Sequence, residues 1–153
     1  MIASAGGAAA LTGLIFVAIS INLAKILDSP GVSSRASEAV VILLGLLLVS
    51  IVALAPNQPR IALGSEFLAI GGALWLLVTT SQIRAALLGL PVSRLLFAIR
   101  VGLYQVAMIS FLAAGLSVII GWHGSMYWLV PACVFSLVAG VQSAWVLLVE
   151  ILR

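Results

Sequence analysis

Five long apolar segments dominate this chain and leave few folds open to it. They cover about residues 5–27, 38–55, 61–83, 100–121 and 127–152. Each is long enough to cross about 30 Å of hydrocarbon as a helix, which takes roughly 20 residues. A helix satisfies its own backbone hydrogen bonds inside a bilayer, so we expect an all-α, polytopic membrane protein built as one transmembrane bundle of five helices.

The composition excludes a water-soluble globular domain. Of the 153 residues, 64% are hydrophobic and 7% are charged. Soluble domains are about 45–50% apolar and about 25% charged, so a single core could not bury this much apolar surface. The seven Lys and Arg exceed the four Asp and Glu. In a membrane protein that excess sets orientation and meets anionic lipid, so we expect a bilayer as partner and no nucleic acid.

The basic residues predict how the chain is oriented. With five spans, one side of the membrane holds Lys25, Arg35, Arg84, Arg94, Arg100 and Arg153, and the other side holds Arg60. The positive-inside rule then places the N-terminus outside and the C-terminus in the cytoplasm. Trp122, Tyr127 and Trp128 flank the outer hairpin, where an aromatic belt is expected. No basic residue precedes the first segment, so we expect an uncleaved helix and not a signal peptide.

The segment 84–100 is apolar but carries three arginines and Pro91. It is too charged to span, so we expect a cytoplasmic interfacial segment or an extension of the neighbouring helices. Ser93 is then the expected N-cap of a fourth helix that protrudes into water. A re-entrant segment is a third alternative, and the cost of arginine at lipid depth disfavours it.

Small residues recur at helical spacing in the last two spans. The stripes are Ala132, Ser136, Gly140 and Ala144 in the fifth span, and Ser110, Ala114, Ser117 and Gly121 in the fourth. Small side chains let membrane helices approach closely. Because the loop between these two spans is short, we expect them to pack as an antiparallel pair.

Glu66 is the one acid that lies well inside a predicted span with no basic residue three or four positions away. An intramembrane acid is by default a functional hypothesis, because burying it charged is costly. The alternative is that Glu66 reaches the outer interface and meets Arg60 or water. His123, the sole histidine, lies in the outer hairpin, where we expect an exposed loop residue.

A second group of polar residues falls in the cytoplasmic half of the predicted spans. Its members are Asn22, Thr79, Thr80, Gln82, Gln105, Gln142 and Ser143, with Glu38 at the edge. Together with Glu66, we take Asn22, Thr79, Gln105 and Gln142 as the candidate intramembrane polar or ion site. These groups either form a structural hydrogen-bond network or line a cavity for a polar solute or ion, and we favour the network.

The remaining charged residues pair at short spacing near helix ends. Lys25 and Asp28, Arg35 and Glu38, and Glu150 and Arg153 are each three residues apart. We expect solvated interfacial pairs that contribute little. Cys133 is the only cysteine, so it forms no intrachain disulfide, and we expect a small buried apolar residue.

Motifs that carry catalysis are missing from the sequence. It contains no HExxH, GxSxG, GxxxxGK[ST] or GxGxxG pattern and no Cys/His spacing for a metal. We therefore expect no enzymatic activity, no catalytic residue, no cofactor and no metal site.

The stretch 11–23 (LTGLIFVAISINL), followed by Arg35 and Glu38, resembles small bacterial inner-membrane proteins of unassigned function. The likeness covers mainly the first two spans. It implies a location in a bacterial plasma membrane, and it implies no activity.

We therefore expect a non-enzymatic interaction or structural subunit that packs with itself or with larger membrane proteins. The alternative is an oligomeric channel or transporter subunit for an ion or small polar solute. Polar side chains that face each other in a closed bundle would favour the structural subunit. Polar side chains that line a water-filled cavity or an oligomer axis would favour the channel or transporter.

Overall fold

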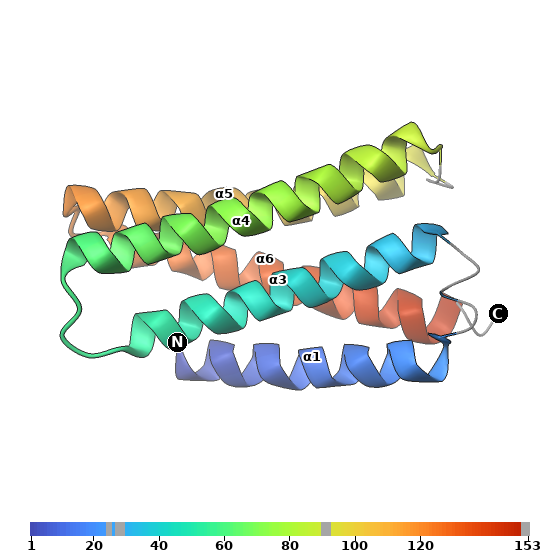
Figure 1. Cartoon of the computed structure of the whole chain (residues 1–153), viewed down its shortest axis with the longest axis horizontal. Helices are drawn as coiled ribbons and strands as arrows, with labels where there is room; N and C mark the ends of the chain where they lie inside the picture. Colours follow the sequence, from blue (N-terminus) through green and yellow to red (C-terminus); the bar gives the residue numbers. More distant parts are fainter. Residues whose placement is uncertain (24–25, 27–29, 90–92, 151–153) are drawn as a thin grey trace.

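The computed structural model describes residues 1–23, 26, 30–89 and 93–150, which form a bundle of helices (Figure 1). The helices are α1 (Ile2–Ile21), α3 (Pro30–Leu54), α4 (Arg60–Leu87), α5 (Arg94–Ile120) and α6 (Leu129–Trp145), with a 3-10 turn, η1 (Ser125–Trp128), before α6 and a π-helical turn, η2 (Val146–Glu150), after it. Within these described residues, five helical segments are long and apolar enough to cross a membrane. The prediction of an all-α fold with five such helices is confirmed.

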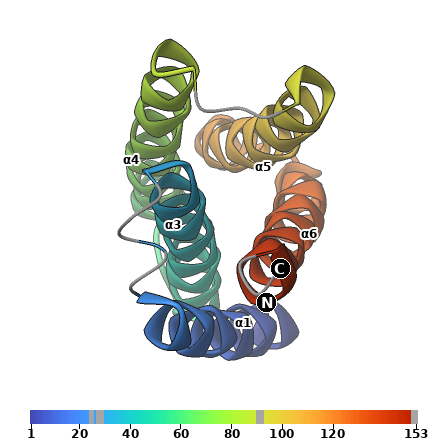
Figure 2. The same ribbon diagram turned by 90° about the vertical axis from the view of Figure 1, so that its right-hand side faces the viewer.

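The five helices run up and down, so successive connections lie at opposite ends of the bundle (Figure 1). We call the end where α1 and α4 finish the C-terminal end, because α6 also finishes there (Figure 1). Viewed from this end, the helices follow one another in the order α1, α3, α4, α5, α6 (Figure 2). Helix α6 contacts α1, α3 and α5, which closes the bundle, and α3 contacts α1, α4 and α6.

Two helix boundaries differ from those expected. Helix α3 begins at Pro30, whereas the sequence predicted a start at residue 38. Proline suits the first turn of a helix, because its missing N–H would have no partner there. Residues 84–87 complete α4 and residues 94–100 open α5, so the described parts of the segment 84–100 extend the two helices. Ser93 precedes α5 in an extended conformation, and its side chain makes no capping hydrogen bond.

Apolar side chains from all five helices form the core, and α3 supplies a continuous row of them. Fully buried residues of α3 include Ala39, Ile42, Leu43, Leu46 and Val49. Their spacing of three and four places them on one face of the helix. Phe67 and Phe111, from α4 and α5, are among the largest fully buried side chains. The core therefore lies along the inner face of α3.

Helices α4 and α5 approach most closely where two glycines face each other. A Cβ atom at Gly64 would lie 2.8 Å from the carbonyl oxygen of Gly115, and a Cβ at Gly115 would lie 3.0 Å from that of Gly64. About two helical turns further along α4, a Cβ at Gly71 would lie 3.2 Å from Cβ of Phe111. Neither Gly64 nor Gly115 belongs to the stripes identified in the sequence. Backbone of α4 and backbone of α5 thus approach each other closely at these glycines.

Alanine at Gly64 should destabilise the bundle, because its Cβ would meet backbone and force the two helices apart. We expect the free energy of unfolding to fall by about 1–3 kcal/mol. Gly72 is the matched control, since a Cβ there would have no heavy atom within 4 Å. Gly72→Ala should leave stability unchanged or raise it by up to about 1 kcal/mol, because alanine favours a helix interior more than glycine does. The measurement is unfolding in detergent followed by circular dichroism, and equal losses in both variants would contradict the glycine contact.

Candidate functional site

Glu38 is the most deeply buried acidic side chain in the described part of the chain, with a relative exposure of 2%. It lies six residues after Val32, where the apolar span of α3 begins. At 1.5 Å per residue this is about 9 Å along the helix. A carboxylate at such a depth is costly unless neighbouring groups neutralise it or donate hydrogen bonds to it.

Two serine hydroxyls and one carboxylate oxygen form a triangle at this site. Ser34 Oγ lies 3.1 Å from Oε1 of Glu38, Ser81 Oγ of α4 lies 3.0 Å from the same oxygen, and the two hydroxyl oxygens are 2.9 Å apart. Each hydroxyl has a single hydrogen to donate. Two hydroxyl hydrogens therefore serve three oxygen–oxygen contacts.

Arg100 of α5 supplies the positive charge. Its Nη2 donates to Oε1 of Glu38 at 3.4 Å, and its side chain is 12% exposed. The guanidinium carbon also lies 5.4 Å from the ring centroid of Phe97, within the range of a cation–π interaction. Oε2 of Glu38 and Nε of Arg100 are buried and have no hydrogen-bond partner. The ion pair joins α3 to α5 but leaves one acceptor and one donor unsatisfied.

The expectation that Glu38 is a solvated interfacial residue is wrong. The early start of α3 places Glu38 more than two turns inside the helix, where Ser81 and Arg100 from α4 and α5 cover it. Lys25, Asp28 and Arg153 lie outside the described residues, so the other two predicted pairs have no structural account.

A second polar cluster surrounds Gln105 of α5. Its Oε1 accepts a hydrogen bond from Nε1 of Trp75 at 2.8 Å. Its Nε2 donates to Oγ1 of Thr79 at 3.1 Å and to Oε1 of Gln82 at 3.4 Å. All three partners belong to α4, so one amide bridges α4 and α5. Of the predicted candidates, the structure brings Thr79 and Gln105 into direct contact.

A third polar contact extends the group to α6. The hydroxyls of Tyr104 and Ser143 lie 3.1 Å apart, and both residues are buried. Sequence reasoning missed Tyr104, Ser81 and Arg100, although Arg100 and Tyr104 are one helical turn apart on α5. Residues spaced by three or four share a helix face, and that spacing could have linked them. The polar groups of α3, α4, α5 and α6 thus face one another near the C-terminal end of the bundle.

Three predicted members stay outside these interhelical contacts. Asn22 is buried and donates to the carbonyl of Ala18 in its own helix, and Thr80 is exposed and donates to carbonyls of the preceding turn. The side chain of Gln142 is exposed on α6. Among the described residues it makes no hydrogen bond. The expected layer therefore exists in part.

Glu66 lies towards the opposite end of the bundle from Glu38. It is half-buried, and its Oε2 accepts a hydrogen bond from Nε2 of Gln58 at 3.2 Å. Its recorded partner is thus an amide of the turn before α4, and not Arg60. His123 is exposed. The two residues form no contact with each other in the part of the chain that the structure describes.

The small-residue stripes have mixed roles. Ala132, Ser136, Gly140 and Ala144 are all buried on α6, and a Cβ at Gly140 would lie 2.8 Å from Cδ2 of Leu43 in α3. Gly140 of this stripe therefore meets α3, whereas we expected it to meet α5. Helices α5 and α6 nevertheless pack against each other, as expected. In the other stripe, Ser110 and Ala114 are buried, and Ser117 donates to the carbonyl of Ala113.

Gly121 ends helix α5. Its backbone is left-handed, with φ of 78°, a conformation that favours glycine. Its N–H donates to the carbonyl of Val118, and the N–H of Trp122 donates to that of Ser117. These two bonds are the pattern of a Schellman cap. Gly121 therefore acts as a helix terminator, and not as the packing residue that we expected.

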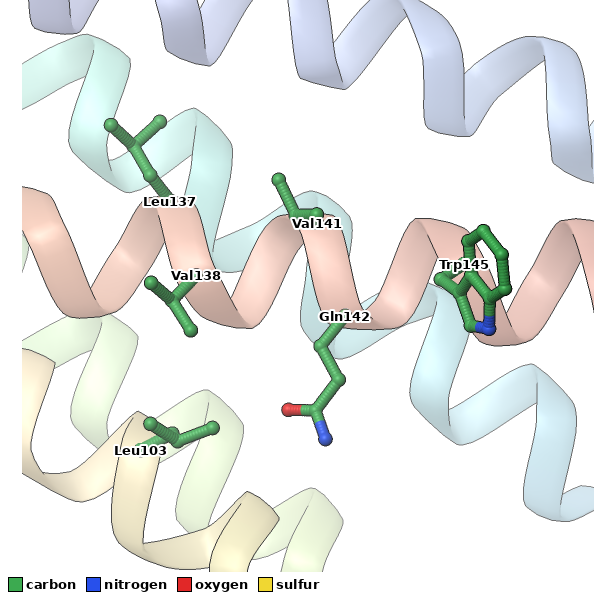
Figure 3. Close-up of a pocket in the computed structure, with 6 residues that line it drawn as sticks. All are labelled: Leu103, Leu137, Val138, Val141, Gln142 and Trp145. Atoms are coloured by element: carbon green, nitrogen blue, oxygen red, sulfur yellow. The ribbon is translucent and has the colours of Figure 1, made fainter.

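A groove runs along the outer surface between α5 and α6. Its lining residues are Leu103, Leu137, Val138, Val141, Gln142 and Trp145 (Figure 3). Gln142 projects from α6 towards the side on which Leu103 of α5 lies (Figure 3). We call this surface the α5–α6 groove. Its lining is apolar except for the amide of Gln142 and the indole N–H of Trp145.

The described residues hold no group of three His, Cys, Asp or Glu side chains that could bind a metal ion. Comparison with family models, with curated proteins and with solved structures found no match. The resemblance to small bacterial inner-membrane proteins therefore stays a prediction.

Removing one partner of the Glu38–Arg100 pair should cost more than removing both. Arg100→Leu leaves a buried carboxylate without its counter-charge, and we expect a loss of about 3–5 kcal/mol in the free energy of unfolding. The double variant Glu38→Leu/Arg100→Leu should recover most of that loss. Arg94, which is exposed, is the control, and Arg94→Leu should cost less than about 0.5 kcal/mol. Additive losses in the denaturant titrations would show that the two side chains do not interact.

Proposed function

We propose that this chain is a non-enzymatic membrane subunit that functions by lateral association, with itself or with larger membrane proteins. The observation that carries the proposal is the direction of its polar groups. Those of Glu38, Arg100, Gln105 and Tyr104 are directed at other helices of the same bundle. Such contacts hold helices together and supply no continuous polar path.

The outer surface supports the same proposal. Val134, Val138, Val141 and Trp145 of α6 are all exposed and apolar, as expected for a face in contact with lipid or with another helix. The α5–α6 groove gives this face a concave shape, an amide from Gln142 and an indole N–H from Trp145. A flat face with apolar side chains alone would suit lipid equally well, and the groove with its amide favours a protein partner.

A specific observation favours a second candidate, an ion-handling channel or transporter subunit. Oε2 of Glu38 is buried without a partner, and the oxygen triangle lacks a third hydrogen. A proton or small cation at Glu38 would supply what is missing. Ion flux into reconstituted vesicles separates the two functions. Only a channel or transporter subunit requires the Glu38 carboxylate to bind and release a proton or cation, so only that function predicts flux above that of empty vesicles.

We further propose a bacterial inner-membrane location with the N-terminus outside and the C-terminus in the cytoplasm. The charge asymmetry of the loops supports this orientation. Among the described residues, Arg35, Arg84, Arg94 and Arg100 lie towards the C-terminal end of the bundle, and Arg60 begins α4 at the other end.

Cysteine labelling tests the orientation in a Cys133→Ala background. Ser125→Cys should react with a membrane-impermeant maleimide added to intact cells, because η1 lies in the outer hairpin. Ser33→Cys, in the first turn of α3 at the C-terminal end of the bundle, should react only after permeabilisation. Labelling of both positions in intact cells, or the reverse pattern, would overturn the proposed orientation.

Photo-crosslinking tests lateral association. A benzoylphenylalanine in place of Val138 should form adducts with protein in native membranes, because Val138 lines the groove. The same residue in place of Phe16, which is exposed on α1, serves as the control and should react with lipid alone. Equal protein adducts from both positions, or none from Val138, would contradict association through this surface.

A further inference from the structure

Gln142 is exposed on the bundle surface in a segment that is long and apolar enough to cross a membrane. It lies six residues before Leu148, where that span ends. This is about 9 Å along the helix. An amide in hydrocarbon without a partner is unfavourable, because both its donor and its acceptor groups have lost water. The groove therefore requires a neighbour that can donate and accept hydrogen bonds.

Gln105 shows what the same side chain does when a partner is present. Its amide lies between α4 and α5 and makes hydrogen bonds with Trp75, Thr79 and Gln82. Gln142 has no such contacts among the described residues. Since both residues lie in apolar helices of the same bundle, the difference indicates that the partner of Gln142 belongs to another molecule.

The surface around Gln142 suits a second helix. Val138 and Val141 lie beside it, and Leu103, Leu137 and Trp145 complete the lining. Valine in a helix already occupies one dominant rotamer, so packing it against a neighbour restricts little further freedom. Close packing of such side chains is a main source of helix association in lipid.

We propose that the α5–α6 groove is the interface of a symmetric dimer of this chain, in which Gln142 of each copy hydrogen-bonds Gln142 of the other. This inference rests on the proposed function and names its partner. A carboxamide is self-complementary, because its NH2 donates and its oxygen accepts. Two copies with the same orientation in a membrane are related by a two-fold axis along the membrane normal. If this axis passes over the groove, Gln142 of one copy faces Gln142 of the other across the interface.

A lipid acyl chain is the competing occupant. It would fill the groove beside Val138 and Leu103, but it has no group that satisfies the amide of Gln142. A different membrane protein is the other competitor, and it would have to supply a polar side chain at the same depth. The second copy needs no further residue, since Gln142 itself provides the complement.

Dimerisation of the purified chain in lipid vesicles tests the proposal, because no other protein is present there. The measurement is energy transfer between donor- and acceptor-labelled chains as the lipid-to-protein ratio increases. Gln142→Leu should weaken the dimer by about tenfold, which corresponds to the loss of two reciprocal interhelical hydrogen bonds. Gln142→Asn, which keeps the amide, should retain more of the dimer than Gln142→Leu.

Gln105→Leu is the matched control, since it removes an amide from the interior. Gln105→Leu should lower the melting temperature and leave dimerisation of the folded protein unchanged. Gln142→Leu should weaken dimerisation and leave the melting temperature of the monomer unchanged. In a Cys133→Ala background, Gln142→Cys should also form a disulfide-linked dimer under mild oxidation. The variant Phe16→Cys on α1 should not.

The outcomes separate this inference from the proposed function. A chain that stays monomeric in vesicles, while Val138 forms adducts with other proteins in native membranes, would overturn the dimer and leave the association function standing. Monomers in vesicles together with lipid adducts alone would overturn both. A dimer that Gln142→Leu leaves intact, or that Phe16→Cys links equally well, would show that the interface lies elsewhere.

Discussion

The absence of water from the bilayer interior is the constraint on which this structure depends. Every polar group there must find a partner in the protein, because hydrocarbon offers none. Oε1 of Glu38 meets this demand with Ser34, Ser81 and Arg100, which come from three helices. Gln105 meets it with side chains of α4. Because these buried polar groups need hydrogen-bond partners, their contacts fix the positions of α3, α4 and α5 relative to one another.

The two ends of the bundle are held by different interactions. Near the start of α4, the backbones of α4 and α5 touch through Gly64 and Gly115, so dispersion forces over a close contact dominate. Near the C-terminal end, the ion pair and the amide cluster connect the helices through specific hydrogen bonds. The glycine contact fixes the distance between α4 and α5. At the polar end, by contrast, Oε2 of Glu38 has no hydrogen-bond partner. The polar end is thus the end where a ligand or proton could change the packing.

Function follows from which polar groups the bundle leaves unsatisfied. The interior network satisfies most of its members, which favours a structural role for the predicted layer over a polar cavity. Gln142 differs from the others because it lies outside, in an apolar groove. An unsatisfied amide on an apolar surface favours a neighbour with hydrogen-bonding groups, and this is the physical basis of the proposed association function.

The sequence by itself determined the five apolar helices, because segment length and hydrophobicity alone decide what can cross a bilayer. It also indicated that amides and hydroxyls gather in one half of the spans, since depth follows from residue number. It could not say which way a side chain faces. Glu38 was expected in water, Gly121 was expected in a packing stripe, and Gln142 was grouped with Gln105. Only the tertiary structure decided these roles, because the rotation of each helix about its axis depends on packing against residues far away in the chain.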